Sequence, residues 1–85
     1  MIQETSRQAY YKILDDGTLG TNQIKILWYI VSHPDFTDLE ISNETNIPIN
    51  CVTGRRNELL KLNFIECSGE KQNTTGHIGK TWRIK

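Results

Sequence analysis

The sequence has few of the features that mark specialised protein classes. Its 85 residues include two Cys, two Pro and one Met, and ten acidic residues balance ten basic ones. Two Cys cannot form the disulfide framework of a small secreted protein, so a cytoplasmic setting is expected. No apolar run is long enough to cross a bilayer, and no signal-peptide pattern is visible. Zero net charge gives no overall attraction to nucleic acid or membranes.

What is present fits one small folded domain over residues 1–85. Apolar residues make up 36% of the chain and charged residues 24%, which is leaner than average but unlike a disordered chain. So short a chain has little room for a closed pocket, and an enzyme is the least favoured class. Cys51, Cys67, His33 and His77 match no zinc-ligand spacing, so no metal or cofactor is expected.

The neutral total conceals an asymmetry. Residues 1–49 carry seven acids and three bases, a net charge of −4, whereas residues 50–85 carry three acids and seven bases, a net charge of +4. The second half can therefore present a basic face to phosphates.

Two helices are predicted in the first part. Thr5 begins a capping-box pattern for a helix over residues 5–14. Residues 21–32 are apolar on most sides, which predicts the central core helix. For Tyr10 and Tyr11, core packing is favoured over a dimer contact. The aromatic stripe of this central helix is also expected in the core: Trp28, Tyr29 and Ile30.

Two further helices are predicted in the second part. Thr37 and Glu40 form a capping box for a helix that ends near Asn46, where a left-handed residue is needed. Asn50 is expected to cap the next helix, which runs to about residue 62. At about one hundred degrees per residue, Val52, Arg56, Leu59, Leu60 and Asn63 lie on its inward side. The outward side comprises Asn50, Thr53, Gly54, Asn57 and Lys61.

Alternating residues then predict a hairpin with strands over residues 64–68 and 80–84 around a polar loop. Helices followed by a hairpin make an α+β, mainly α fold. Two helices joined by a tight turn over about 37–62, and a hairpin wing over about 64–84, describe a winged helix-turn-helix.

Three stretches resemble winged-helix regulators of bacteria, archaea and phages, loosely those of the multiple-antibiotic-resistance type: residues 37–42, 47–55 and 57–65. The wing, with Thr75, Gly76 and Trp82, resembles the small phage and prophage versions. Asn63 replaces the Gly usual in this pattern, and Arg56 replaces an aliphatic residue. The resemblance implies binding to double-stranded DNA, commonly as a homodimer, and control of transcription or replication.

The outward helix side carries the residue types that such binding needs. Asn50, Thr53 and Asn57 can contact base edges, and Gly54 permits close approach. Arg55 can reach phosphate or guanine, and Lys61 suits phosphates. The wing offers further residues to a backbone or minor groove: Lys71, Gln72, Asn73, Thr74, Thr75, His77 and Lys80.

Each of these residues also has a structural interpretation. Asn50 can serve only as a cap, Gly54 can relieve crowding between helices, and Arg55 and Arg56 can pair with Glu58 or Glu40. A protein-interaction module without DNA binding is the main alternative function, since the net charge is zero. Binding to single-stranded or A-form nucleic acid is disfavoured, because the outward side has no aromatic residue for base stacking.

Overall fold

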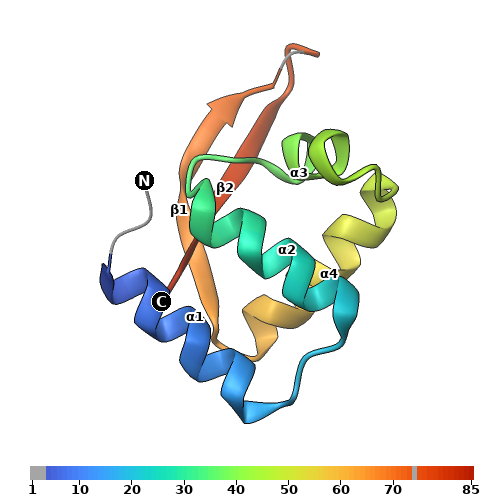
Figure 1. The fold of residues 1–85 in the computed structure, drawn as a ribbon. Helices are drawn as coiled ribbons and strands as arrows, with labels where there is room; N and C mark the ends of the chain where they lie inside the picture. The colour runs from blue at the N-terminus through green and yellow to red at the C-terminus, as the bar shows by residue number, and fades with distance from the viewer. Residues whose placement is uncertain (1–3, 74) are drawn as a thin grey trace.

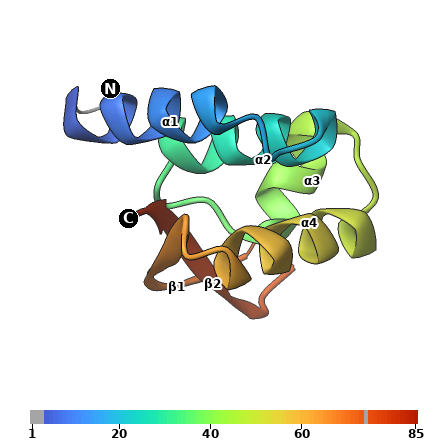
Figure 2. The ribbon, with the colours of Figure 1, turned by 90° about the horizontal axis from the view of Figure 1, so that it is seen from below.

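The computed structural model describes residues 4–73 and 75–85. Four helices precede a two-stranded antiparallel hairpin, as predicted. The helices are α1 (Glu4–Asp16), α2 (Thr21–Ser32), α3 (Asp38–Thr45) and α4 (Ile49–Lys61), and the strands are β1 (Ile65–Gln72) and β2 (Ile78–Ile84). Figure 1 shows the hairpin projecting beyond the helices, and Figure 2 shows α1 and α4 on opposite sides of the molecule.

The bounds of α2 are the predicted ones, and local capping chemistry explains why α3 begins and ends where predicted. The amide of Glu40 donates to the Thr37 hydroxyl at 3.3 Å, and the amide of Thr37 donates to the Glu40 carboxylate at 3.0 Å, which is the predicted capping box. Asn46 ends α3 with a φ of 59°, in the predicted left-handed conformation. Across the turn that follows, the Ser42 hydroxyl donates to the carbonyl of Ile47 at 2.6 Å.

Two predicted caps are wrong. Thr5 lies inside α1, which begins at Glu4 and continues to Asp16 before Gly17 ends it with a φ of 73°. Asn50 lies inside α4, because Pro48 takes the cap position and its carbonyl accepts from the amide of Val52 at 3.0 Å. Pro favours such a start, since its fixed φ suits the approach to a helix.

The strands are longer than the predicted ones. Polar residues 69–72 pair with β2 after a bulge between Cys67 and Gly69, so the loop shrinks to residues 73–77. Over these residues backbone hydrogen bonds pair the strands, and apolar alternation no longer marks them. Asn63 precedes the hairpin with a φ of 64°, a conformation that Asn tolerates in place of Gly.

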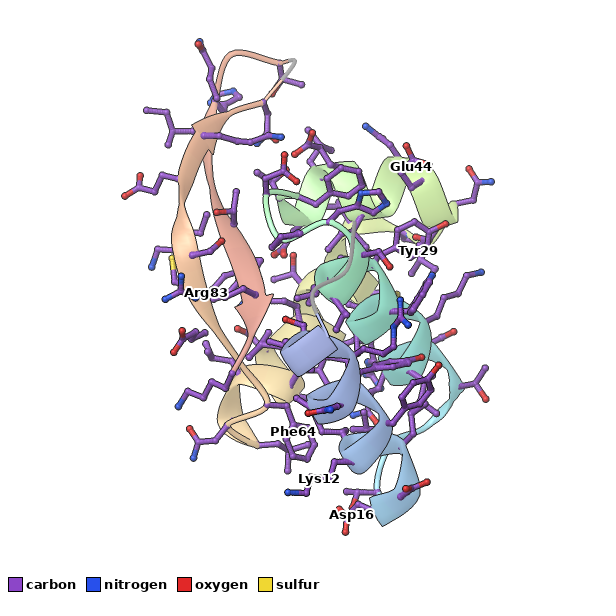
Figure 3. The ribbon with its side chains drawn as sticks, turned by 60° about the vertical axis from the view of Figure 1, so that its left-hand side comes forward. Lys12, Asp16, Tyr29, Glu44, Phe64 and Arg83 are labelled. Carbon is purple, nitrogen blue, oxygen red and sulfur yellow. The ribbon has the colours of Figure 1, made fainter. Side chains whose placement is uncertain are left out.

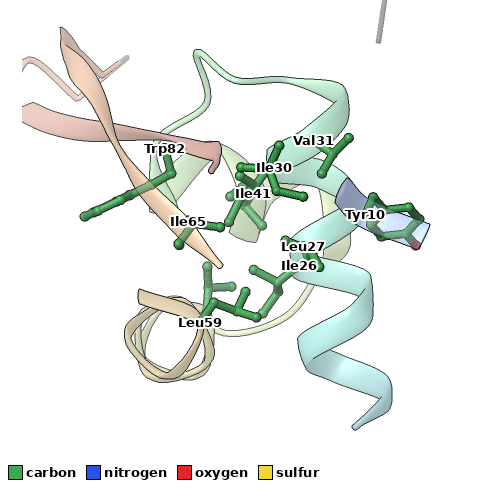
Figure 4. Close-up of a cluster of buried hydrophobic side chains, with 11 residues drawn as sticks. Tyr10, Ile26, Leu27, Ile30, Val31, Ile41, Leu59, Ile65 and Trp82 are labelled. Carbon is green, nitrogen blue, oxygen red and sulfur yellow. The ribbon is translucent and has the colours of Figure 1, made fainter. Parts of the chain in front are cut away.

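The core forms around α2, as Figure 4 shows. Fully buried side chains come from α2, α3, α4 and β1: Ile26, Leu27, Ile30, Ile41, Val52, Leu59 and Ile65. Tyr10 packs into this core from α1 with 8% exposure, as favoured, whereas Tyr11 is 55% exposed. The core prediction for Trp28 is wrong, because 43% of this residue is exposed. None of the helices in the described residues is both long enough and apolar enough to span a membrane.

Candidate nucleic-acid interface

The outward side of α4 is a polar stripe of Asn50, Gly54, Asn57 and Lys61. Asn50, Asn57 and Lys61 are exposed, whereas Val52 on the opposite side is fully buried. The helix period places these four residues above one another along about three turns. The structure therefore presents a continuous row of amide and ammonium groups to solvent, centred on a glycine.

Gly54 does not relieve crowding. A Cβ atom added at this position would meet no heavy atom of the protein within 4 Å. A glycine inside a helix costs roughly 1 kcal/mol relative to alanine, and nothing in the fold requires it here. The crowding interpretation of Gly54 is therefore wrong, and close approach to a binding partner stays a prediction.

Thr53 departs from the predicted outward set. It is half-buried, and its hydroxyl donates to the carboxylate of Asp38 at 3.2 Å. Thr53 therefore connects α4 to the start of α3. The sequence could place Thr53 near the edge of the outward side but could not reveal an acceptor fifteen residues earlier in the chain.

Arg56 is on the inward side, as predicted, and finds a partner there. Its guanidinium lies 2.9 Å from the carboxylate of Asp38 and 4.2 Å from the centre of the Trp82 indole ring. Only 11% of the Arg56 side chain and 18% of the Asp38 side chain are exposed. One residue thereby joins α3, α4 and β2. In the sequence, the sign of this contact was a charged residue at a position where an aliphatic one is usual. The sequence did not identify Asp38 as its partner.

Arg55 lies on the other flank of α4, beside the N-terminus of α2. It pairs with Glu58 at 3.3 Å, and Glu58 also accepts from the side-chain amide of Gln23 at 2.8 Å. The alternative that Arg55 pairs with Glu58 is thus confirmed. Because both partners are more than 40% exposed, this pair contributes little to stability and can be exchanged for an external anion.

The wing, residues 65–84, is anchored on the N-cap of α3. The Thr37 hydroxyl donates to the Asn73 side chain at 2.5 Å, and Lys71 lies 3.0 Å from the carboxylate of Glu40. Burial alone would raise the pKa of Glu40, but hydrogen bonds from Thr37 and Lys71, with the charge of Lys71, hold that pKa below its ordinary value. Lys71 and Asn73, both predicted to contact DNA, therefore have partners within the protein.

The rest of the predicted wing set is distributed unevenly. Gln72, Thr75, His77 and Lys80 are exposed near the end of the hairpin, and Thr74 lies outside the described residues. Closer to the base of the hairpin, Arg83 pairs with Glu66 at 2.7 Å; Figure 3 labels its side chain. The Gln72 side chain donates to the carbonyl of Gly76 at 3.2 Å, so Thr75, His77 and Lys80 are the exposed polar residues of the outer wing for which the described residues show no such bond.

Gly79 sets how closely the wing approaches α3. A Cβ atom at Gly79 would lie 2.9 Å from the Asn73 side chain and 3.1 Å from that of Thr37. We expect Gly79→Ala to lower the free energy of unfolding by about 1–2 kcal/mol, the lower part of the range for overpacking, because the Asn73 side chain can shift. Urea denaturation measures this, with Gly54→Ala as the matched glycine-to-alanine control. Unchanged stability would contradict the close contact.

The described residues contain no group of three or more His, Cys, Asp or Glu placed to hold a metal ion. Cys51, on α4, and Cys67, on β1, are free and exposed.

Solved structures of one protein share this architecture. Three crystal structures of MarR from E. coli superpose on the chain with a TM-score of 0.66: the reduced form at 16% sequence identity, the wild-type apo form at 15% and a cysteine-to-serine variant at 17%. The fold is a winged helix. The sequence resemblance to winged-helix regulators of the multiple-antibiotic-resistance type is confirmed at the level of the fold.

The winged helix of this chain accounts for only part of MarR. The superposition covers 96–98% of this chain and 58% of the MarR chain. No protein-family model and no curated protein matches the sequence. In this winged helix, α3 and α4 form the helix-turn-helix and the hairpin β1–β2 forms the wing, as predicted.

Proposed function

We propose that the protein binds double-stranded DNA and regulates transcription or replication. One observation carries the proposal: α4 presents Asn50, Asn57 and Lys61 as an exposed polar stripe, with the half-buried Gly54 between the two asparagines. In a helix-turn-helix the second helix enters the major groove, and its N-terminal residues contact base edges. Asparagine amides are suited to those edges, and a central glycine allows the helix axis to lie close to them.

The placement of cations supports this proposal. Arg55 lies on the flank of α4 that faces α2, whereas Lys80 lies on the wing, on the flank that faces Arg56 and Trp82. A major groove is bordered by two phosphate backbones, one on each side of an inserted helix. Cations on both flanks therefore suit a helix inserted between two strands better than a single basic patch would.

A salt titration with mixed-sequence duplex DNA tests the proposal. Binding should weaken linearly on a logarithmic plot as counterions return to the DNA. Lys61→Ala and Lys80→Ala should each reduce the slope by about 1, because each removes one phosphate contact. Lys12→Ala, on α1, is the matched control and should leave the slope unchanged. Absence of binding even at low salt would contradict the proposal.

A narrower role, as a regulator of a phage or mobile element, rests on the resemblance of the wing, with Thr75, Gly76 and Trp82, to the small phage and prophage versions of this pattern. We include it in the proposal on those grounds.

A protein-interaction module is the second candidate, and the ion pairs favour it. Four bases of the second half are paired within the chain: Arg55, Arg56, Lys71 and Arg83. This leaves the basic half less able to attract phosphates than its composition suggests. If the duplex titration fails, affinity capture with the whole chain as bait, compared with Asn57→Ala, would test whether α4 contacts a protein instead.

We further propose a homodimer formed through α1 and α2. Tyr11 is 55% exposed and Trp28 43% exposed, and the rings of both contact the buried ring of Tyr10, with centroids 5.7 Å and 5.6 Å away. Because α1 and α4 lie on opposite sides of the molecule, a second copy bound there leaves α4 free (Figure 2). Trp28→Ser should shift sedimentation at micromolar concentration from dimer to monomer. A monomeric wild-type protein at every concentration would contradict this.

A further inference from the structure

The side chain of Arg56, on the inward side of α4, is held in a fixed orientation. Its Nε donates to both carboxylate oxygens of Asp38 at 3.2 Å, and its Nη2 donates to one of them at 2.9 Å. The indole of Trp82 supports the guanidinium, with the ring centre 4.2 Å from Cζ. Two partners on different elements thus fix the plane of the guanidinium, so its remaining nitrogen points in a fixed direction.

That remaining nitrogen, Nη1, donates to the side-chain oxygen of Asn57. A guanidinium has donors only, so the amide atom that faces it must be Oδ1 rather than Nδ2. The two atoms of a planar amide point about 120° apart. Because Arg56 is buried and Asn57 is exposed, the Nδ2 group of Asn57 is turned outward, away from the protein.

We propose that Arg56 is a positioning residue that determines the base preference of Asn57; this inference rests on the proposed DNA binding. An asparagine pairs with adenine by using both its oxygen and its nitrogen. Because Arg56 occupies one of the two lone pairs of the Asn57 oxygen and holds that atom toward the protein, the group that Asn57 presents outward is its Nδ2 donor group. Guanine offers two adjacent acceptors, N7 and O6, in the major groove, whereas adenine offers N7 beside a donor. The structure therefore assigns guanine, rather than adenine, to Asn57.

The test begins with the wild-type protein and a pool of random-sequence duplexes. The base pair at which Asn57→Ala loses discrimination is the pair that Asn57 contacts. Guanine should be preferred there by roughly 5- to 150-fold. Arg56→Met keeps an apolar stem on Trp82 but removes the guanidinium, which frees the Asn57 oxygen. It should abolish the guanine preference or shift it to adenine, with the preferences at other positions unchanged.

Arg55→Met is the matched control. It removes the same charge from the neighbouring position of the same helix, where the partner is Glu58 rather than Asn57. It should weaken binding to all duplexes alike and leave the guanine preference in place. A purely electrostatic role for Arg56 would make the two variants behave in the same way.

A second measurement tests the positioning without DNA and covers the case in which Arg56→Met does not fold. Arg56→Lys keeps a positive charge beside Asp38 but lacks the second N–H arm. The side-chain amide of Asn57 should have a high heteronuclear NOE in the wild-type protein and a low one in Arg56→Lys. The exposed Asn50 amide on the same helix gives the reference value for a mobile side chain.

The outcomes separate the two proposals. An unchanged guanine preference in a folded Arg56 variant, an adenine preference in the wild-type protein, or a mobile Asn57 amide in the wild-type protein would each overturn the positioning role and leave DNA binding intact. A wild-type protein that binds no duplex would overturn the proposed function, and this inference with it.

Discussion

Gly54→Gln is expected to stabilise the protein and to weaken its binding to DNA. Glutamine exceeds glycine in helix propensity by roughly 0.5–1 kcal/mol, and no protein atom lies within 4 Å of a Cβ at this position. The free energy of unfolding should therefore rise by about that amount. The long side chain would stand between Asn50 and Asn57 on the outward face and keep both from the base edges. Loss of two base contacts corresponds to about 2–4 kcal/mol, or roughly 30- to 1,000-fold in affinity.

Urea denaturation and duplex titration of the same samples measure the two effects. Gly54→Ala is the graded control, since it should give the same gain in stability with a much smaller obstruction. A variant that loses affinity only because it is misfolded would lose stability as well, so the opposite signs distinguish the two causes. Gly54→Gln that binds DNA as tightly as the wild-type protein would exclude the outward face of α4 as the contact surface.

Features set by neighbouring residues could be predicted from the sequence. The capping box of Thr37 and Glu40 and the left-handed Asn46 involve residues at most five positions apart, so α3 was placed correctly at both ends. The period of α4 likewise separated buried Val52 from exposed Asn57. Such features depend on backbone geometry and hydrogen bonds within one turn. Where two residues compete for the cap position, as Pro48 and Asn50 do at the start of α4, the same local reasoning chose the wrong one.

Features set by distant residues could not be predicted. From the sequence, Lys71 is expected to be a cation available to DNA. Only the fold brings the Glu40 carboxylate to within 3.0 Å of it. Strand residues 69–72 are polar, and their pairing with β2 leaves no apolar pattern to detect. The sequence predicts Trp28 in the core because α2 is apolar on most sides. The pattern of α2 therefore does not show which side stays exposed after α1 and the rest of the core have packed against it.

Arg56 could be predicted in part, because its place on the helix depends on neighbouring residues and its partner is distant in the sequence. Periodicity placed Arg56 on the inward side, and the sequence resemblance marked it as unusual there, but neither identified Asp38 eighteen residues earlier. Two partners allow the Arg56 guanidinium to lie among buried side chains. The Asp38 carboxylate balances its charge, and the Trp82 ring packs against its planar face. The residue that departs from the pattern of similar regulators therefore has a structural role here, because it joins α3, α4 and β2.

Asp38→Ala is expected to lower the free energy of unfolding by about 2–3 kcal/mol. Removing one partner of a buried ion pair leaves the other charge uncompensated, which costs roughly 3–5 kcal/mol when burial is complete. The Asp38 side chain is 18% exposed and that of Arg56 is 11% exposed, so water compensates part of this cost. Thr53 would lose its acceptor as well. In a domain of this size, such a loss lowers the thermal midpoint by roughly 10–20 °C.

Two further variants separate the ion pair from other effects of the substitution. Asp38→Asn keeps an acceptor for Arg56 and Thr53 but removes the charge, and should cost less than Asp38→Ala. The double variant Asp38→Ala, Arg56→Met removes both charges and should recover most of the lost stability, because an apolar pair at such a site is often no less stable than an ion pair. A double variant as unstable as the sum of the two single variants would show that Asp38 and Arg56 act independently. Recovery would show that the contact between them sets how α3, α4 and the wing fit together.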